Sequence, residues 1–270
     1  MKPIMKPTSL LLASLLVTPA CVLTDRPAPG IANFSRASDT DTAAYGTVEV
    51  QAHGVFEPGA TKAFPVQVRH GLTEDVEVYA DWSVYEKVER PGQHDGEGIG
   101  DAGVGIRHRF WEGSQGTSAA LEGRVSIPTG DTDEGTGTGS LDWFGAVMVT
   151  QDIDDLRLNG WLEVGVLGDA LDDDTPMQRA MAVSAATNLG EDLVAYAELS
   201  RVLQEEFDPA YGTLGLGYRV MPDTLLELGV AVGMNDEAAD EVVYLGFTSN
   251  LGILGAQGPR ASYDGGQPGQ

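Results

Sequence analysis

The chain has 270 residues, a formal net charge of −25, 35 glycines and a single cysteine. So large an acidic excess excludes a nucleic-acid-binding protein, because few Lys or Arg side chains are present to neutralise phosphates. One cysteine excludes a disulfide framework and a zinc site built from cysteine pairs, and no apolar run reaches the roughly 18 residues of a transmembrane helix.

The first 20 residues have the layout of a secretory signal peptide. Lys2 and Lys6 give a basic start, residues 9–17 form a short apolar core, and small residues precede a cleavage point after Ala20. We therefore expect residues 1–20 to be a signal peptide that directs export.

Cys21 is the first residue after the predicted cleavage point. A cysteine at this position resembles a bacterial lipoprotein processing site, where the thiol is acylated. The alternative is ordinary cleavage after Ala20 with an incidental cysteine. Residues 21–43 contain Pro, Gly, Ser, Asp and Thr without periodicity and are predicted to be a flexible linker. One acyl chain anchors a protein only marginally, so a stable membrane location needs something more.

Apolar and other residues alternate along most of the chain from Tyr45 to Leu251. Between residues 156 and 166, every even position is apolar or glycine, whereas the odd positions include Arg157 and Glu163. This alternation predicts β-strands with two different faces, and each segment is about as long as the 9–11 residues of a tilted membrane-spanning strand. The predicted strands are 44–52, 62–70, 74–84, 101–111, 117–127, 140–150, 155–167, 176–187, 191–201, 210–220, 223–233 and 240–248.

The connections between these segments alternate in length. Those after even-numbered segments are tight, whereas those after odd-numbered segments are longer and polar (53–61, 85–100, 128–139, 168–175, 202–209 and 234–239). Short periplasmic turns and longer outer loops are typical of a transmembrane β-barrel. We therefore predict an all-β fold over residues 44–251, an antiparallel transmembrane barrel of about 12 strands, followed by a disordered tail over 252–270. A soluble β domain is the alternative.

The two faces of the predicted strands carry different chemistry. A charged side chain at the bilayer midplane costs about 2–4 kcal/mol, so the charged faces should point into the lumen, where they can pair across strands. The alternative to a pore role is that such pairs only plug and stiffen a narrow barrel. The candidate lumen-lining residues are Glu49, Arg69, Glu77, Asp81, Arg107, Arg109, Glu122, Arg124, Arg157, Glu163, Glu198, Arg219 and Glu227.

Two positions depart from the strand pattern. Pro65 lies inside a predicted strand, where it cannot donate a ladder hydrogen bond, and Arg179 falls on the apolar face of segment 176–187. A β-bulge could accommodate either residue.

Catalytic, cofactor and metal motifs are weak. Residues 98–103 match GxGxxG, but no helix follows, as dinucleotide binding would require. The four histidines show no metal-ligand spacing, and the acidic runs in the loops lack EF-hand spacing, so we interpret them as a solvated surface. A barrel hydrolase such as an outer-membrane phospholipase has no local signature here. The sequence predicts no enzyme activity, cofactor or metal.

Four stretches, 64–82, 98–110, 125–143 and 211–233, together resemble the family of outer-membrane transporters named for the MetA pathway of phenol degradation. The matching marks are GLT followed by an acidic residue (71–74), GxGD (98–101) and PTGD with a later GxG (128–139). The resemblance implies a bacterial outer-membrane barrel that contacts membrane lipids and passes small, often aromatic or hydrophobic molecules. Barrels of this kind commonly end on a terminal aromatic residue. In this chain, Phe247 is instead followed by an extension. A non-transporting structural or lipid-tethered barrel is the alternative, and the sequence indicates no oligomeric state.

Overall fold

The computed structural model describes residues 37–59, 61–89, 95–168, 177–204 and 208–253, and the regular elements within these ranges are all β-strands. No helix in these ranges is long and apolar enough to cross a membrane. The strands are β1 (Thr47–Glu57), β2 (Thr61–Gly71), β3 (Val76–Val88), β4 (Gly96–Gly98), β5 (Ala102–Glu112), β6 (Thr117–Ile127), β7 (Asp142–Ile153), β8 (Leu156–Val166), β9 (Met177–Asn188), β10 (Leu193–Leu203), β11 (Ala210–Met221), β12 (Thr224–Gly233) and β13 (Glu241–Ile253).

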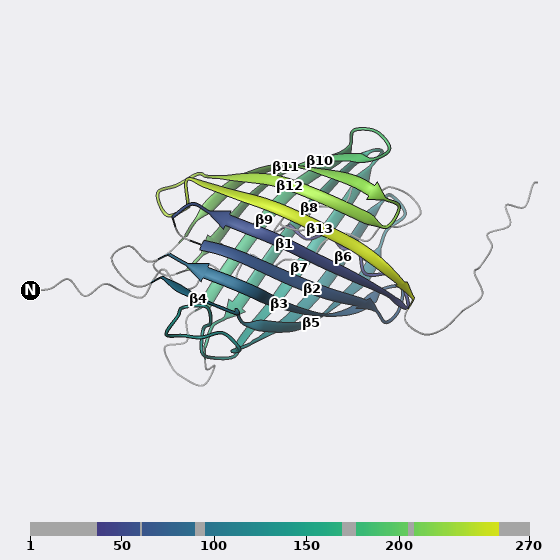
Figure 1. Ribbon diagram of the computed structural model, residues 1–270. Coiled ribbons are helices and arrows are strands. Elements are labelled where there is room, and N and C mark those ends of the chain that lie inside the picture. Colours follow the sequence, from purple (N-terminus) through teal and green to yellow (C-terminus); the bar gives the residue numbers. More distant parts are fainter. Residues whose placement is uncertain (1–36, 60, 90–94, 169–176, 205–207, 254–270) are drawn as a thin grey trace, which may run out of the picture.

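Twelve of these strands close into an antiparallel barrel in chain order (Figure 1). The barrel closes because β1 pairs with β2 on one side and with β13 on the other. The short β4 pairs only with the end of β3, which pairs next with β5. The structure therefore confirms the predicted fold class, and each predicted strand overlaps one strand of the barrel.

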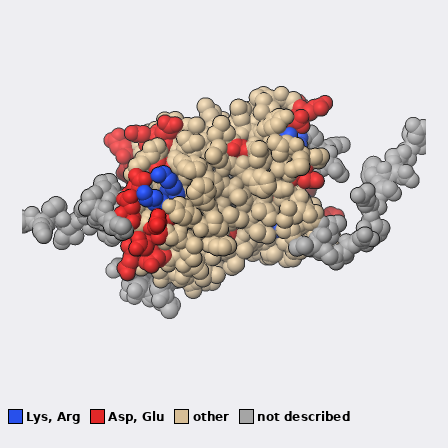
Figure 2. Space-filling model, in the orientation of Figure 1, with Lys and Arg blue, Asp and Glu red and all other residues tan. Residues whose placement is uncertain are grey.

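The outer face of the barrel is apolar. Leu162, Val183 and Leu214 project outward and are 60%, 57% and 68% exposed, whereas alternate residues on the same strands face inward and are largely buried. Figure 2 shows charged atoms gathered at the two ends, with a broad middle band nearly free of them. Such a band suits contact with lipid.

Exposed aromatic residues lie toward both ends of this band. Trp111 and Tyr218 lie near short turns, whereas Tyr85 and Trp143 lie near the long loops. Aromatic girdles at the two membrane interfaces are typical of outer-membrane barrels.

The first predicted strand is wrong in its extent. β1 runs to Glu57 rather than residue 52, so the predicted long loop over 53–61 shrinks to three residues. The alternation fades there because the outward position 54 is glycine; the rings of Phe56 and Phe64 fill that space, 2.7 and 3.3 Å from where a Cβ would lie. The last strand also extends to Ile253, into the predicted tail.

The two irregular positions are accommodated differently. Val84 and Tyr85 on β3 together oppose the single residue Phe64, so a bulge lies beside Pro65 as expected. Arg179 needs no bulge, because the pairing of β9 with both neighbours is regular. Its exposed side chain projects outward near the long-loop end of β9.

The described part of the predicted linker, residues 37–43, is not a linker exposed to solvent. Residues 37–40, 42 and 43 are buried, because they lie inside the barrel and bond to its inward side chains. The predicted signal peptide, Cys21 and most of the predicted tail lie outside the described residues.

Candidate functional site: the lumen of the barrel

A row of alternating charges crosses five neighbouring strands inside the barrel. Arg69 on β2 pairs with Glu49 on β1 (Nη1–Oε1, 3.0 Å) and with Glu77 on β3 (Nη2–Oε2, 2.7 Å). Arg107 on β5 pairs with Glu122 on β6 (2.7 Å) and lies 3.8 Å from Glu77. The strand register sets these contacts, because it places Glu49 opposite Arg69, Glu77 opposite Arg107, and Arg107 opposite Glu122.

Arg124 and Asp81 form a separate bidentate pair. The guanidinium Nε and Nη2 donate to the two carboxylate oxygens at 2.9 and 2.6 Å. The pair lies over Gly103 of the intervening strand, where a Cβ would approach Asp81 within 2.6 Å and Arg124 within 2.8 Å. A glycine is thus required for this close approach. Arg124 also lies 5.4 Å above the Phe144 ring, a cation–π contact.

Residues 37–43, which we call the inner segment, run along the lumen beside this charged wall. The Ala43 N–H donates to Glu77 near the short-turn end, and the Ala37 N–H donates to Glu198 halfway along β10. Between them, the Thr40 N–H donates to the Thr150 hydroxyl. The backbone hydrogen bonds of a segment without a sheet partner are therefore supplied by lumen side chains.

Three arginines hold the inner segment. Arg157 Nη1 donates to the carboxylates of Asp41 (2.5 Å) and Asp39 (3.2 Å). Arg107 Nη1 donates to the carbonyl oxygens of Asp41 (3.1 Å) and Asp39 (3.4 Å), and Arg69 Nη2 to that of Asp41 (3.1 Å). Charge-assisted hydrogen bonds are stronger than neutral ones, so the segment is fixed at several points.

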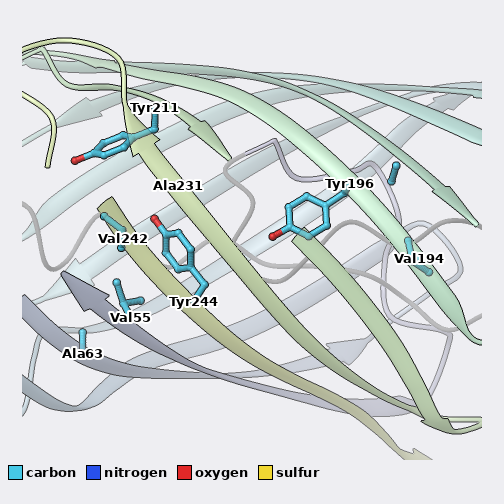
Figure 3. Close-up of a cluster of buried hydrophobic side chains, with 9 residues drawn as sticks. Val55, Ala63, Val194, Tyr196, Tyr211, Ala231, Val242 and Tyr244 are labelled. Carbon is cyan, nitrogen blue, oxygen red and sulfur yellow. The ribbon is translucent and has the colours of Figure 1, made fainter. Parts of the chain in front are cut away.

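The wall from β8 to β13 is acidic and aromatic. Glu163, Glu198 and Glu227 project from β8, β10 and β12 on the inward parity. Figure 3 shows the buried side chains of Tyr196 on β10, Tyr211 on β11 and Tyr244 on β13, on the inner face of the barrel.

Two of the inward tyrosines lie flat over glycines of the next strand. The Tyr79 ring covers Gly105, and the Tyr196 ring covers Gly215, where a Cβ would lie 2.0 Å from the tyrosine oxygen. Because the rings lie along the wall, they take up less of the lumen. This packing explains why glycine occurs at these two inward positions.

Two candidate lumen residues lie at the short-turn rim instead. Arg109 bonds to Asp75 (2.9 Å) and to the Glu74 carbonyl in the β2–β3 turn. Arg219 donates to the Glu191 carbonyl in the β9–β10 turn. The other eleven candidates lie on the inward faces of their strands, and the structure brings Glu49, Arg69, Glu77, Arg107 and Glu122 into one network.

At the long-loop end, Asp101 fastens the loop between β6 and β7. Its Oδ1 accepts from the Gly130 N–H (2.9 Å), and its Oδ2 accepts from the Thr138 N–H (2.8 Å) and hydroxyl (3.0 Å). Asp101 ends the GxGD stretch, and residues 130 and 138 belong to the PTGD and GxG stretch. Two motifs that are separate in the sequence thus form one contact.

Sequence reasoning missed Asp39, Asp41 and Asp101. All three lie outside the strands, so the alternation of apolar and polar residues does not point to them. The one sequence signal for Asp101 was its place at the end of the GxGD motif, residues 98–101. Within the described ranges, no group of three or more His, Cys, Asp or Glu side chains is arranged to hold a metal ion.

No family model and no curated protein sequence matches the chain. Solved structures do. An outer-membrane channel from Pseudomonas putida F1 aligns with a TM-score of 0.62 and 7% identity over 78% of this chain and 98% of that one. The NanC porin aligns with a TM-score of 0.56 and 10% identity, and the KdgM porin with a TM-score of 0.54 and 8% identity. Each alignment covers 74% of this chain and 98% of the porin. The chain thus has the fold of outer-membrane channels and porins, in agreement with the expected outer-membrane location.

Proposed function

We propose that this chain is an outer-membrane β-barrel that acts as a passive channel for small solutes. The observation that carries the proposal is the inside-out distribution of side chains: an apolar outer band surrounds a lumen lined by charged and polar groups. A water-soluble barrel would gain nothing from exposing Leu162, Val183 and Leu214. The fold shared with channels and porins supports the same conclusion.

The inner segment restricts this channel. It is buried among lumen side chains and held by Arg69, Arg107 and Arg157. Solute passage therefore depends on the space left beside the segment or on its displacement from the arginines.

We further propose membership of the MetA-pathway family and, with it, small aromatic or hydrophobic solutes. The contact of Asp101 with residues 130 and 138 supports the family proposal, because it gives two of the resembling motifs one structural purpose. The solute class rests on the resemblance alone.

The alternative is a structural or lipid-tethered barrel that transports nothing. The dense ion pairs of the Glu49–Glu122 row and the inner segment favour it, because both fill the lumen. Two measurements separate these functions. An unboiled sample that migrates differently from a boiled one on an SDS gel demonstrates a membrane-type barrel. Liposomes containing the protein should then swell in small neutral solutes; an inserted barrel that admits none of several solutes overturns the channel.

A further inference from the structure

We propose that the lumen selects by charge, admitting cationic and neutral solutes and disfavouring anionic ones. The inference deepens the proposed channel function and rests on it. It depends on where positive and negative side chains lie between the two rims of the barrel.

The arginines of the lumen that lie in the described strands are already paired with carboxylates of the protein. Among the described strands, four arginines lie between the rims, and each is paired with at least one carboxylate: Arg69, Arg107, Arg124 and Arg157. Arg69 has two carboxylate partners and Arg157 has three, from Asp39, Asp41 and Asp152. The pairs leave no excess positive charge to attract an anion.

The wall from β8 to β13 adds negative charge to the lumen. Glu198 and Glu227 project inward from β10 and β12, and Glu163 from β8. In the described parts of β9 to β13, the inward positions carry a single basic residue, Arg219, which lies at the rim and is turned to a turn carbonyl. The inward-facing charges of the described strands therefore sum to a negative value.

The charged side chains at the long-loop end of the lumen are also negative. Asp101 and Asp142 are buried there and accept hydrogen bonds from loop N–H groups, and Glu86 is buried close to Asp101. The carboxylates at the long-loop end thus carry the same sign of charge as Glu163, Glu198 and Glu227 farther inside the barrel.

The narrow shape of the barrel strengthens the effect of these inward charges on ions in the lumen. Field lines from charges inside a narrow, low-dielectric wall are focused into the lumen, and rings of Asp or Glu select cations in other channels. Exposed loop acids more than about 8–10 Å from the path contribute little at physiological salt, because ions screen them. The inward carboxylates should therefore dominate selectivity.

The test is the zero-current potential of the full mature protein in a planar bilayer between unequal KCl solutions. We expect a shift toward the potassium equilibrium potential. A current whose zero-current potential is near zero, or shifted toward the chloride potential, overturns the charge selectivity but leaves the channel intact. A membrane without current overturns the channel itself and this inference with it.

A matched pair of variants locates the selective charges. The triple variant Glu163→Gln, Glu198→Gln, Glu227→Gln keeps side-chain size and a hydrogen-bond acceptor in each place and should move the zero-current potential toward zero. The control, Glu191→Gln, Asp192→Asn, Asp223→Asn, removes the same charge from exposed turns at the rim and should shift it much less. Heat-modifiable migration verifies that both fold. An equal shift in the two variants overturns the assignment to the lumen.

Discussion

Arg157 and Asp41 lie 116 residues apart in the chain, and their side chains meet inside the barrel at 2.5 Å. One belongs to the wall at the start of β8, and the other to the inner segment. The same guanidinium also reaches Asp39 at 3.2 Å and Asp152 at 2.7 Å. Arg157 thus joins the inner segment to the end of β7.

We expect Arg157→Gln to increase solute entry. The change removes charge-assisted hydrogen bonds to the carboxylates of the inner segment, and a loss of about 2 kcal/mol shifts its docking equilibrium about thirty-fold. The swelling rate of liposomes with small neutral sugars measures the effect. Arg109→Gln is the control, because Arg109 bonds to the β2–β3 turn and not to the segment. Equal swelling rates in the two variants would contradict a restraining role for Arg157.

Gly215→Ala should destabilise the barrel by about 1–3 kcal/mol, because a Cβ there would lie 2.0 Å from the oxygen of Tyr196. Gly160→Ala is the control: nothing lies within 4 Å of its Cβ position, so its stability should be unchanged or slightly higher. The temperature at which heat-modifiable migration is lost measures stability. Combining Gly215→Ala with Tyr196→Ala should cost less than the sum of the single changes, and strict additivity would argue against the contact.

Asp101→Ala should loosen the β6–β7 loop, because three hydrogen bonds lose their acceptor. Hydrogen exchange at the Gly130 and Thr138 amides should become faster, while exchange in the strands stays slow. Asp236→Ala, which removes an exposed carboxylate from the β12–β13 loop, should leave these amides protected. If the two amides exchange equally fast in the wild type and in Asp101→Ala, the hydrogen bonds to Asp101 do not hold the β6–β7 loop in solution.

Arg69→Gln should be strongly destabilising, by about 3–5 kcal/mol, because it leaves the buried carboxylates of Glu49 and Glu77 without their shared partner. Lys62→Gln also removes a positive charge, but from an exposed pair with Glu89, so it should cost less than about 1 kcal/mol. Urea unfolding in lipid vesicles, followed by tryptophan fluorescence, compares the two. If the two variants lose a similar free energy of unfolding, the row of charges from Glu49 to Glu122 adds little to stability.

Cys21→Ser tests the proposed lipidation. If Cys21 is acylated, the mass of the mature wild-type protein should exceed that of its polypeptide by the acyl groups, and the variant should lose this excess together with lipoprotein processing. If the two mature masses differ only by the exchange of sulfur for oxygen, Cys21 is not acylated.

The strands could be predicted from the sequence because lipid and lumen impose opposite demands on neighbouring residues. An outward side chain must be apolar or small, an inward one can be charged, and a strand turns successive side chains to opposite faces. Arg157 and Leu158 therefore reveal their sides of the wall without any structure. The same logic fails at Gly54, where the outward space is filled by rings from two other positions.

The sequence by itself determined the class of fold and the apolar and polar faces of most strands, since both depend on local alternation. Only the tertiary structure decided which charges meet. The row from Glu49 to Glu122 depends on the register of five strands, and the placement of Asp39 and Asp41 depends on a lumen that exists only after closure. Contacts made across a closed barrel leave no periodic trace in the chain, because the residues that form them are separated by whole strands.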